Sequence, residues 1–438
     1  MKKLAFIIAI VCTFSVLSSC NPTGGGGGTA GTADFEFETE KFKGKTLTIW
    51  QNWEYTDTYG ELALFQEKTG ATVKYEMIPY GTASDGSDYY NKISTAIVSG
   101  TGPDACYLWQ MAVPSWTRSG LLLPWDDLIN MDTEPFKSKI NAAVTEFYTY
   151  NGKKYGLMNN DELNFYWVYY DKQMFSDSGL EDPYDLFRAG QWTWEKMMTM
   201  GQALTYDSDN DKTIDKYGFG GYATDGWLAS NGANYVKFTD GKPIFALSDP
   251  EAIAAMEQER DVFMKIKPYS EIGESDEKNF INGNVAMYYE GTFSIKTLKE
   301  AKGDNLGCVP MPTGPNFDKS KTTAVEINAV PLFICNTCKE KELLAHYVTY
   351  LYSNKGNEAD KEQKTIDEAF LGDKELYEFY KELKQYGWIP NDISFGRLPK
   401  LLQLKVLWNY DETPTKLVQS VVNLAQGEID DVFYGTGE

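Results

Sequence analysis

Short apolar runs with two different periods alternate along the first part of the chain. Polar and apolar side chains alternate over residues 46–50 and again over residues 72–77, which is the pattern of half-buried strands. Between them, apolar side chains recur at near-helical spacing over residues 59–65, and Gly70 ends that run. We expect strand, helix and strand to form a βαβ unit with a parallel sheet and a right-handed crossover.

The same rhythm continues for one more helix and strand. A helix-like run over residues 89–98 ends at Gly100, and a third strand is expected over residues 104–109. This alternation predicts an open α/β sheet, in which ligands bind beyond the carboxyl ends of the strands.

A second lobe is expected to begin near residue 158. Residues 165–170 are densely aromatic and β-branched, as in a strand that is buried on both faces. Thr193 can cap a helix with one apolar face, and Pro250 opens another helix with an acidic neighbour in its first turn. Residues 285–289 have the pattern of a further strand.

Later segments are expected to return to the first lobe. Strands are predicted over residues 306–310 and 324–334, and residues 339–433 are mostly helical in pattern, without an internal repeat. The predicted organisation is a signal peptide over 1–19, a lipidated cysteine and flexible Gly-rich linker over 20–40, a first lobe over 41–157 plus 303–360, and a second lobe over 158–302 plus 361–438.

Composition narrows the function. The chain has 438 residues, 42% of them hydrophobic, which is enough for a sizeable core and two or three structural units. The net charge of −22 repels phosphate backbones, so nucleic-acid binding is not expected. With His346 as the single histidine, Cys/His zinc clusters are excluded and a Ser-His-Asp triad would depend on one residue. We expect His346 to be a packed or solvated side chain.

The first twenty residues have the features of an export signal. Lys2 and Lys3 precede an apolar stretch over residues 4–17, which is shorter than the roughly 20 residues that a membrane span needs. The stretch ends in Leu-Ser-Ser-Cys at Cys20, which is similar to the bacterial lipobox, whose cysteine accepts a diacylglycerol. The alternative is a chance cysteine beside an ordinary cleavage site. We therefore expect an exported protein, anchored by lipid to the outer face of the cell membrane or cell envelope.

Four further cysteines follow outside the signal region. Cys106, Cys308, Cys335 and Cys338 are too few and too spread to form a disulfide scaffold. Cys335 and Cys338 form a C-x-x-C between a strand-like and a helix-like run, without a second pair for zinc. Small buried or helix-start cysteines are favoured over a redox or metal role.

Several segments, in this order, resemble the extracellular solute-binding proteins (family 1) of sugar-importing ABC transporters, the family that includes maltose-binding protein. Each motif alone is weak, but together they extend over most of the chain. They are the lipobox, Leu47 to Trp50 with Phe65 to Gly70, Ser99 to Asp104, Tyr169 to Lys172, Thr193 to Glu195, and Asn284 to Phe293.

The resemblance implies a two-lobed α/β periplasmic-binding-protein fold (type II), with open sheets flanked by helices, a hinge and an inter-lobe cleft. It implies a binding protein without catalytic activity or a required cofactor, which closes on a carbohydrate and presents it to ABC permease subunits. We expect a monomer that contacts the membrane only through its lipid.

Carbohydrates have apolar CH faces and a belt of hydroxyls, so aromatic rings with nearby carboxylates and amides suit them. Candidates therefore stand at strand ends and lobe crossings, where core packing or a solvated loop is the alternative. Trp227 and Trp388 are expected in glycine-containing loops. At Phe293 the family commonly has a tryptophan that stacks on the sugar; phenylalanine keeps a stacking face but loses the N–H donor. The predicted ligand residues are Asn52, Trp53, Glu54, Trp109, Asp161, Glu162, Asn164, Trp227, Glu290, Phe293 and Trp388.

One acidic segment resembles an EF-hand-type calcium loop, because oxygen ligands at this spacing can wrap a hard cation. Two departures are Lys212 in the usual glycine position and Gly218 in place of a bidentate glutamate. The alternative is a solvated acidic turn. A structural Ca²⁺ would be held by Asp207, Asp209, Asp211, Thr213 and Asp215.

Two other functions stay open at this point. An extracellular glycoside hydrolase also uses aromatic clefts and paired carboxylates, with Glu54, Glu162 or Glu290 as acid or nucleophile. The same fold could instead bind a peptide, a polyamine or a metal, although one histidine argues against metal transport.

Overall fold

The computed structural model describes residues 35–79, 81, 87–108, 113–266, 276–353, 358–389 and 411–435. The chain divides into a unit of residues 1–36 and a unit of residues 37–438, and the described helices and strands belong to the second. The predicted signal peptide and Cys20 lie outside the described residues, as does the linker up to Asp34.

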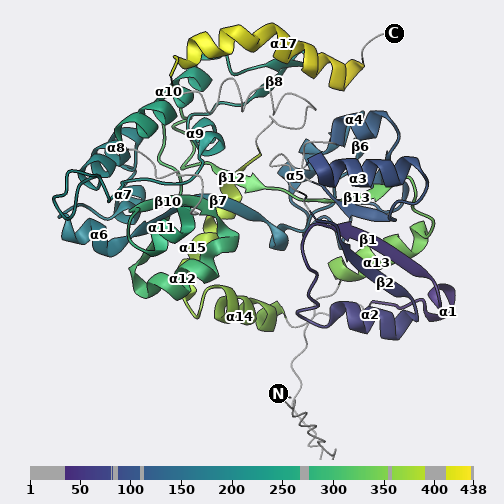
Figure 1. The fold of residues 1–438 in the computed structure, drawn as a ribbon. Coiled ribbons are helices and arrows are strands. Elements are labelled where there is room, and N and C mark those ends of the chain that lie inside the picture. Colours follow the sequence, from purple (N-terminus) through teal and green to yellow (C-terminus); the bar gives the residue numbers. More distant parts are fainter. Residues whose placement is uncertain are drawn as a thin grey trace, which may run out of the picture. The chain divides into compact units, whose positions relative to one another are not determined.

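The first sheet consists of β1 (Thr46–Gln51), β2 (Thr72–Met77), β3 (Ala105–Tyr107), β4 (Leu122–Leu123) and β13 (Leu332–Cys335). Its spatial order is β2-β1-β3-β13-β4, and Figure 1 labels β1, β2 and β13. β1 is parallel to β2 and β3, whereas β13 is antiparallel to β3 and β4. The parallel pairing predicted for the first three strands is therefore confirmed, within a sheet that also contains antiparallel strands.

The helices of this region also follow the sequence pattern. α2 ends where Gly70 adopts a left-handed conformation at φ 68° and donates its N–H to Gln66, which glycine does without steric cost. The elements are α1 (Thr39–Phe42), α2 (Glu61–Thr69), α3 (Ser87–Val98), α4 (Val113–Arg118), η2 (Trp125–Asp127), α5 (Ala142–Phe147), β5 (Thr149–Tyr150), β6 (Lys153–Lys154) and α13 (Lys341–Ser353).

The second sheet is organised around one long strand, β7 (Asn164–Asp171), which is buried over most of its length as its composition predicts. The other strands are β10 (Met287–Gly291), β11 (Leu306–Val309), β12 (Val325–Asn328) and β14 (Gly387–Trp388). β10, β11 and β12 are all antiparallel to β7, and β14 is parallel to β12.

The prediction that residues 306–310 return to the first lobe is wrong. β11 pairs with β7, from Leu306 opposite Asp171 to Val309 opposite Val168. The chain leaves β10 through a short helix and comes back on the other side of β7, so both strands belong to one sheet. The predicted strand over 324–334 is divided between the sheets: β12 belongs to the second and β13 to the first.

Helices of the second region include α8, whose cap is confirmed because Thr193 Oγ1 accepts the N–H of Lys196 at 3.3 Å. The elements are η3 (Asn160–Glu162), α6 (Lys172–Asp177), α7 (Pro183–Arg188), α8 (Trp194–Ala203), α9 (Thr224–Ser230), β8 (Val236–Thr239), β9 (Lys242–Phe245), α10 (Pro250–Lys265), α11 (Asp276–Ile281), η4 (Thr292–Ser294), α12 (Ile295–Lys302), η5 (Gly303–Asn305), α14 (Glu358–Ala369), α15 (Lys374–Leu383), η6 (Lys384–Tyr386) and α17 (Pro414–Tyr434).

Two chain segments run side by side between the sheets. Leu157 and Leu332 exchange backbone hydrogen bonds of 3.0 and 2.9 Å. A few residues further on, Asn164 and Phe165 pair with Asn328 and Ile327 at the start of β7. Paired crossing segments of this kind are where φ/ψ changes can be absorbed when two lobes move relative to each other.

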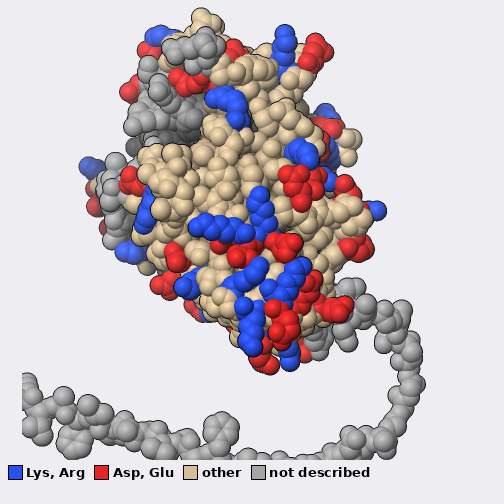
Figure 2. All heavy atoms as spheres, turned by 90° about the vertical axis from the view of Figure 1, so that its right-hand side faces the viewer, with Lys and Arg blue, Asp and Glu red and all other residues tan. Residues whose placement is uncertain are grey.

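Each sheet has its own hydrophobic core. Ile93, Ile97 and Phe333 belong to the core of the first sheet, while Trp167 and Leu228 belong to that of the second. Among the described residues, we find no helix with the length and hydropathy needed to cross a bilayer. On the face shown in Figure 2, Lys and Arg side chains lie next to Asp and Glu side chains. Many acidic side chains on this face therefore have a basic neighbour.

Candidate functional site

Aromatic side chains gather around the carboxyl end of β1. Trp53, in the loop after β1, is 39% exposed and its ring lies 5.1 Å from that of Tyr107 at the end of β3. Tyr55 stacks on Tyr75 at 3.8 Å with the planes 6° apart, and the Tyr75 hydroxyl lies 3.1 Å from the hydroxyl of Tyr347. We call these five residues the first-sheet group.

Glu162, a carboxyl of the segment between the sheets, lies beside this group. Its side chain is exposed, yet the surrounding protein raises its pKa to about 7, first by desolvation and then through the nearby charges of Asp161 and Glu61. Its charge in turn contributes to raising the pKa values of Tyr75 and Tyr107, in which desolvation is the larger cause. A carboxyl that solvent reaches but protein largely surrounds is well placed to accept hydrogen bonds from a bound molecule.

A second set of rings and carboxyls lies on the second sheet. The Tyr289 hydroxyl on β10 donates to Glu326 Oε2 on β12 at 2.8 Å. Tyr166 stacks on Tyr289 at 5.7 Å and meets the 54% exposed ring of Phe293 edge-on at 6.0 Å. Trp388 is the neighbour of Glu326 in the register of β12 and β14. These five residues together with Asp225 at the start of α9 form the second-sheet group.

A short polar segment connects the two groups. Asn164, two residues after Glu162, accepts a hydrogen bond from the Thr292 hydroxyl at 3.1 Å, and Thr292 precedes Phe293. The Asn164 amide also reaches the Glu162 carbonyl at 3.5 Å. The segment that crosses between the sheets therefore links Glu162, beside the first-sheet group, through Asn164 to Thr292, the residue before Phe293 of the second-sheet group.

Several predicted ligand residues belong to these groups or adjoin them. Trp53 and Glu162 lie at the first, Phe293 and Trp388 in the second, and Asn164 between them. Ligand contact stays a prediction for each of them.

The other predicted residues are not members of the two groups. Glu54 and Asp161 are exposed, and Asn52 has a buried Oδ1 without a hydrogen-bond partner among the described residues. Glu290 is partly buried and accepts hydrogen bonds from the Tyr288 hydroxyl and the Gly291 N–H, each at 2.7 Å. Trp109 lies outside the described residues.

The predictions for the two loop tryptophans need correction. Trp227 is not in a loop: it lies in α9, is 1% exposed, and packs edge-on against Trp194 at 5.7 Å in the core of the second sheet. Trp388 is in the short strand β14 rather than a loop, and remains partly exposed. The structure thus places Trp227 in the core of the second sheet.

Sequence reasoning missed the residues that tie each group together. Tyr55, Tyr75 and Tyr107 line the first, and Tyr166, Tyr289, Asp225 and Glu326 make up most of the second. The available signal was the alternation within the strands: Glu326 stands between the buried residues Val325 and Ile327. A charged residue inside such an apolar run marks a face that is not simply core.

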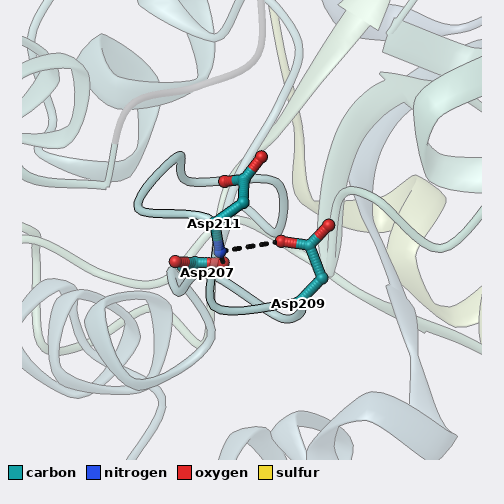
Figure 3. A group of neighbouring side chains, drawn as sticks. All are labelled: Asp207, Asp209 and Asp211. Carbon is teal, nitrogen blue, oxygen red and sulfur yellow. Dashed lines mark hydrogen bonds between the residues drawn. The ribbon is translucent and has the colours of Figure 1, made fainter.

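The acidic loop is partly assembled as predicted. Carboxylate oxygens of Asp207, Asp209 and Asp211 lie within 4.8 Å of one another (Figure 3). The Asp215 carboxylate makes other contacts: it accepts hydrogen bonds from the backbone N–H and the hydroxyl of Ser208. Lys212 takes a left-handed φ of 74° in the position where glycine was expected. Backbone N–H groups already donate to the Asp207 carboxylate, as in a self-contained acidic turn, so calcium stays a prediction.

Other features lie apart from both groups. A pocket on the second region is lined by Tyr184, Arg188 and Phe379 among others, and the Arg188 guanidinium is held by Glu382 at 2.7 and 2.8 Å. The four described cysteines are buried and form no disulfide, as the favoured interpretation predicts, and the Cys335 Sγ lies 3.4 Å from the Cys106 Sγ. His346 packs against Phe42 at 5.0 Å, also as expected.

These features are those of a binding protein with two sheets, each contributing rings and carboxyls near a pair of crossing segments. The model of the bacterial extracellular solute-binding proteins matches residues 52–358, and the chain belongs to this family. The family is extracellular, which implies export of the chain. Among curated proteins, no sequence matches.

Solved structures of similar fold include three binding proteins. An ABC substrate-binding protein from Listeria monocytogenes in complex with cycloalternan is 19% identical, with a TM-score of 0.67 over 88% of this chain and 98% of that one. The GacH receptor of Streptomyces glaucescens, solved with acarbose, is 17% identical with a TM-score of 0.66 over 88% and 99%. A maltose/maltodextrin-binding domain from Bdellovibrio bacteriovorus, bound to maltotriose, is 15% identical with a TM-score of 0.63 over 88% and 100%. The two-lobed periplasmic-binding-protein fold is therefore confirmed.

Proposed function

We propose that this chain captures a mono- or oligosaccharide outside the cytoplasm and delivers it to the permease subunits of an ABC importer. The family and the saccharides in the similar structures support this. The observation that carries the proposal is that Glu162 and Asn164 lie between a group of rings on the first sheet and a group of rings and carboxyls on the second. Rings can cover the CH faces of a sugar while carboxyl and amide groups bond its hydroxyls.

Capture involves movement of the two lobes about the paired crossing segments. A ligand that contacts both groups stabilises the closed arrangement by the difference between its contacts in the closed and open states. The sugar is released unchanged, since this chain supplies binding and no chemical step.

Isothermal titration calorimetry against maltotriose, mannobiose, cellobiose, lactose and their monosaccharides tests the proposal. We expect at least one of these saccharides to bind with 1:1 stoichiometry and to be recovered intact by chromatography afterwards. Small-angle scattering should show a smaller radius of gyration with that sugar than without it. Absence of heat for every saccharide, or recovery of cleaved sugar, contradicts the proposal.

We also propose that Cys20 carries the lipid and that the glycine-rich linker tethers a monomeric binding domain to the envelope. Mass spectrometry of the membrane fraction should find a diacylglyceryl-modified amino-terminal cysteine. Cys20→Ser should release the chain into the soluble fraction. A wild-type chain without lipid, or a serine variant that stays with the membrane, would count against the anchor.

A further inference from the structure

One face of α13 holds the segment that follows the glycine-rich linker. Glu342, His346 and Tyr350 stand four residues apart and therefore share a face of this helix. Residues 37–41 lie along that face in the opposite direction, and we call these contacts the amino-terminal dock. They are Lys41 Nζ to the Glu342 carboxylate at 3.5 Å, the Glu38 N–H to His346 Nε2 at 3.3 Å, and the Phe37 ring to the Tyr350 ring at 5.3 Å.

The two ends of the dock are held differently. At the end next to β1, the Phe42 ring is 1% exposed and fixes the chain in the core. In the middle, the Thr39 hydroxyl donates to the Lys68 carbonyl at 2.7 Å on the surface. Nearer the linker, the hydrogen bond to His346 fastens the backbone of Glu38 to α13. Phe42 is therefore the point about which the dock can open.

His346 is a hydrogen-bond acceptor in the dock, and it can have that role only while its ring is neutral. A ring nitrogen that accepts an N–H carries no proton of its own, whereas both nitrogens of an imidazolium are donors. Once Nε2 is protonated, it faces the Glu38 N–H donor to donor. The rings of Phe42 at 5.0 Å and of Phe65 in α2 at 5.8 Å pack beside the imidazole, so its charge is poorly solvated there.

The charged groups around His346 nearly balance each other. Lys41 lies 3.0 Å from the Glu38 carboxylate and 3.5 Å from that of Glu342. Burial lowers the pKa of His346 below its ordinary value of 6.5; the charge of Glu38 opposes this effect and that of Lys41 adds to it. Stability from the neutral ring is therefore present above about pH 6.5 and is lost as the pH falls through the lower pKa of the folded chain.

We propose that His346 is a pH-sensitive switch: its neutral ring holds residues 37–41 on α13, and protonation of Nε2 in mild acid loosens them. The switch determines where the tether leaves the binding domain, and an open dock lets the tether reach up to roughly 17 Å further. That consequence rests on the proposed anchor at Cys20, whereas the dock itself does not depend on the lipid.

Amide hydrogen exchange read by mass spectrometry tests the switch. The sample is the chain from residue 20 with Cys20→Ser and without a histidine tag. After correction for intrinsic exchange rates, residues 37–41 should be protected roughly 3- to 10-fold less at pH 5 than at pH 7.5, as expected for the loss of one hydrogen bond. Peptides from β1 and β7 should keep their protection. Equal protection of residues 37–41 at the two pH values overturns the inference.

Nuclear magnetic resonance assigns the change to His346, because the chain has one histidine and hence one imidazole Cε1–H signal. Its titration midpoint should lie below 6.5 and coincide with the midpoint for the loss of protection. Midpoints that differ by more than about one pH unit would assign the loosening to another group and overturn the inference.

Two substitutions separate the acceptor from the charge. His346→Gln keeps an acceptor oxygen that does not titrate, so residues 37–41 should be protected equally at both pH values. His346→Leu has no acceptor, so their protection at pH 7.5 should fall to the level of the wild type at pH 5. Glu342→Gln changes a charge on the same face and is the matched control, which should keep the pH dependence.

Circular dichroism spectra and unchanged saccharide affinity verify that each variant is folded. A pH dependence that persists in folded His346→Gln overturns the assignment. Because these measurements do not require the lipid, a failed switch leaves the proposed anchor and saccharide capture standing, and a failed anchor leaves the switch standing.

Discussion

The two groups use their aromatic rings in different ways. In the first-sheet group, tyrosines stack on one another and share hydroxyl contacts, with Glu162 as the neighbouring carboxyl. In the second-sheet group, the Tyr289 hydroxyl holds a carboxyl, and Phe293 is the most exposed ring. The first group is suited to cover the face of a sugar, and the second to bond its rim. A ligand that contacts both groups would favour the closed arrangement of the two lobes.

The largest expected effect concerns the support beneath the second-sheet group. Trp227 is 1% exposed and contacts Trp194, so Trp227→Ala should lower the free energy of unfolding by about 3–5 kcal/mol through lost burial and a cavity. Urea denaturation measures the change. The matched control is Trp53→Ala, an exposed tryptophan of the first-sheet group, for which about 1 kcal/mol or less is expected. Equal losses for the two variants would contradict the placement of Trp227 in the core.

The next largest expected effect is a change of stability with pH. It comes from Glu259, an acid whose pKa the charge of Asp225 helps to raise. Burial raises the pKa of Glu259 to about 8 from its usual 4.5, so the folded state holds a proton that the unfolded state releases. Stability from this group is therefore fully present below about pH 4.5 and is lost as the pH rises through about 8.

Glu259→Gln removes that titration. At pH 9 it should stabilise the protein by a few kcal/mol, with little change at pH 5, because the raised pKa spans several units and each unit corresponds to about 1.4 kcal/mol. Thermal or urea unfolding at the two pH values measures the difference, with Glu257→Gln as the exposed control. The same loss of stability at both pH values would mean that the carboxyl is needed for packing and not penalised for its charge.

Ligand affinity distinguishes the two groups directly. Trp53→Ala and Phe293→Ala remove exposed rings, so each should leave the fold intact and weaken saccharide binding by about 10- to 100-fold. We expect the larger loss at Trp53, because an indole offers more stacking area than a phenyl ring. Tryptophan fluorescence or calorimetry on both variants gives the comparison. If only one variant is impaired, the ligand contacts a single lobe.

The smallest effect is expected at the acidic loop of the second lobe. If Asp207, Asp209 and Asp211 bind Ca²⁺ with the millimolar affinity of extracellular sites, 5 mM calcium should raise the melting temperature by about 2 °C. Asp209→Asn should abolish that increase, and magnesium at the same concentration serves as the ionic control. An unchanged melting temperature identifies a self-contained acidic turn.

The sequence predicts elements better than it predicts their neighbours. β1, β7 and α8 fall where the periodicity places them, because side-chain period and capping are local properties. β11 is buried throughout and carries no alternation, so its sequence does not say which sheet it joins. Its partner is decided by where the chain re-enters the sheet after α12, which is a property of the whole fold.

The residues of the candidate site differ in the same way, since some follow from local sequence signals and others from contacts that the whole fold sets. Trp53 and Glu162 could be predicted because they follow strands or precede them. Glu326 and Tyr289 could not, because their meeting depends on the register of β12 and β10 on β7. Trp227 is predicted in a glycine-containing loop, but its neighbour Gly226 lies in α9 and closely contacts Tyr289. The sequence alone does not show whether a glycine lies in a turn or allows close packing.

A crystal structure of the protein with its best-binding saccharide would show whether one ligand contacts both groups. We expect one intact sugar molecule that stacks on Trp53 or Tyr107 and, at the same time, donates hydroxyl hydrogen bonds to Glu326 or Asp225. A sugar bound to one group alone, or seated in the pocket beside Arg188, would contradict it.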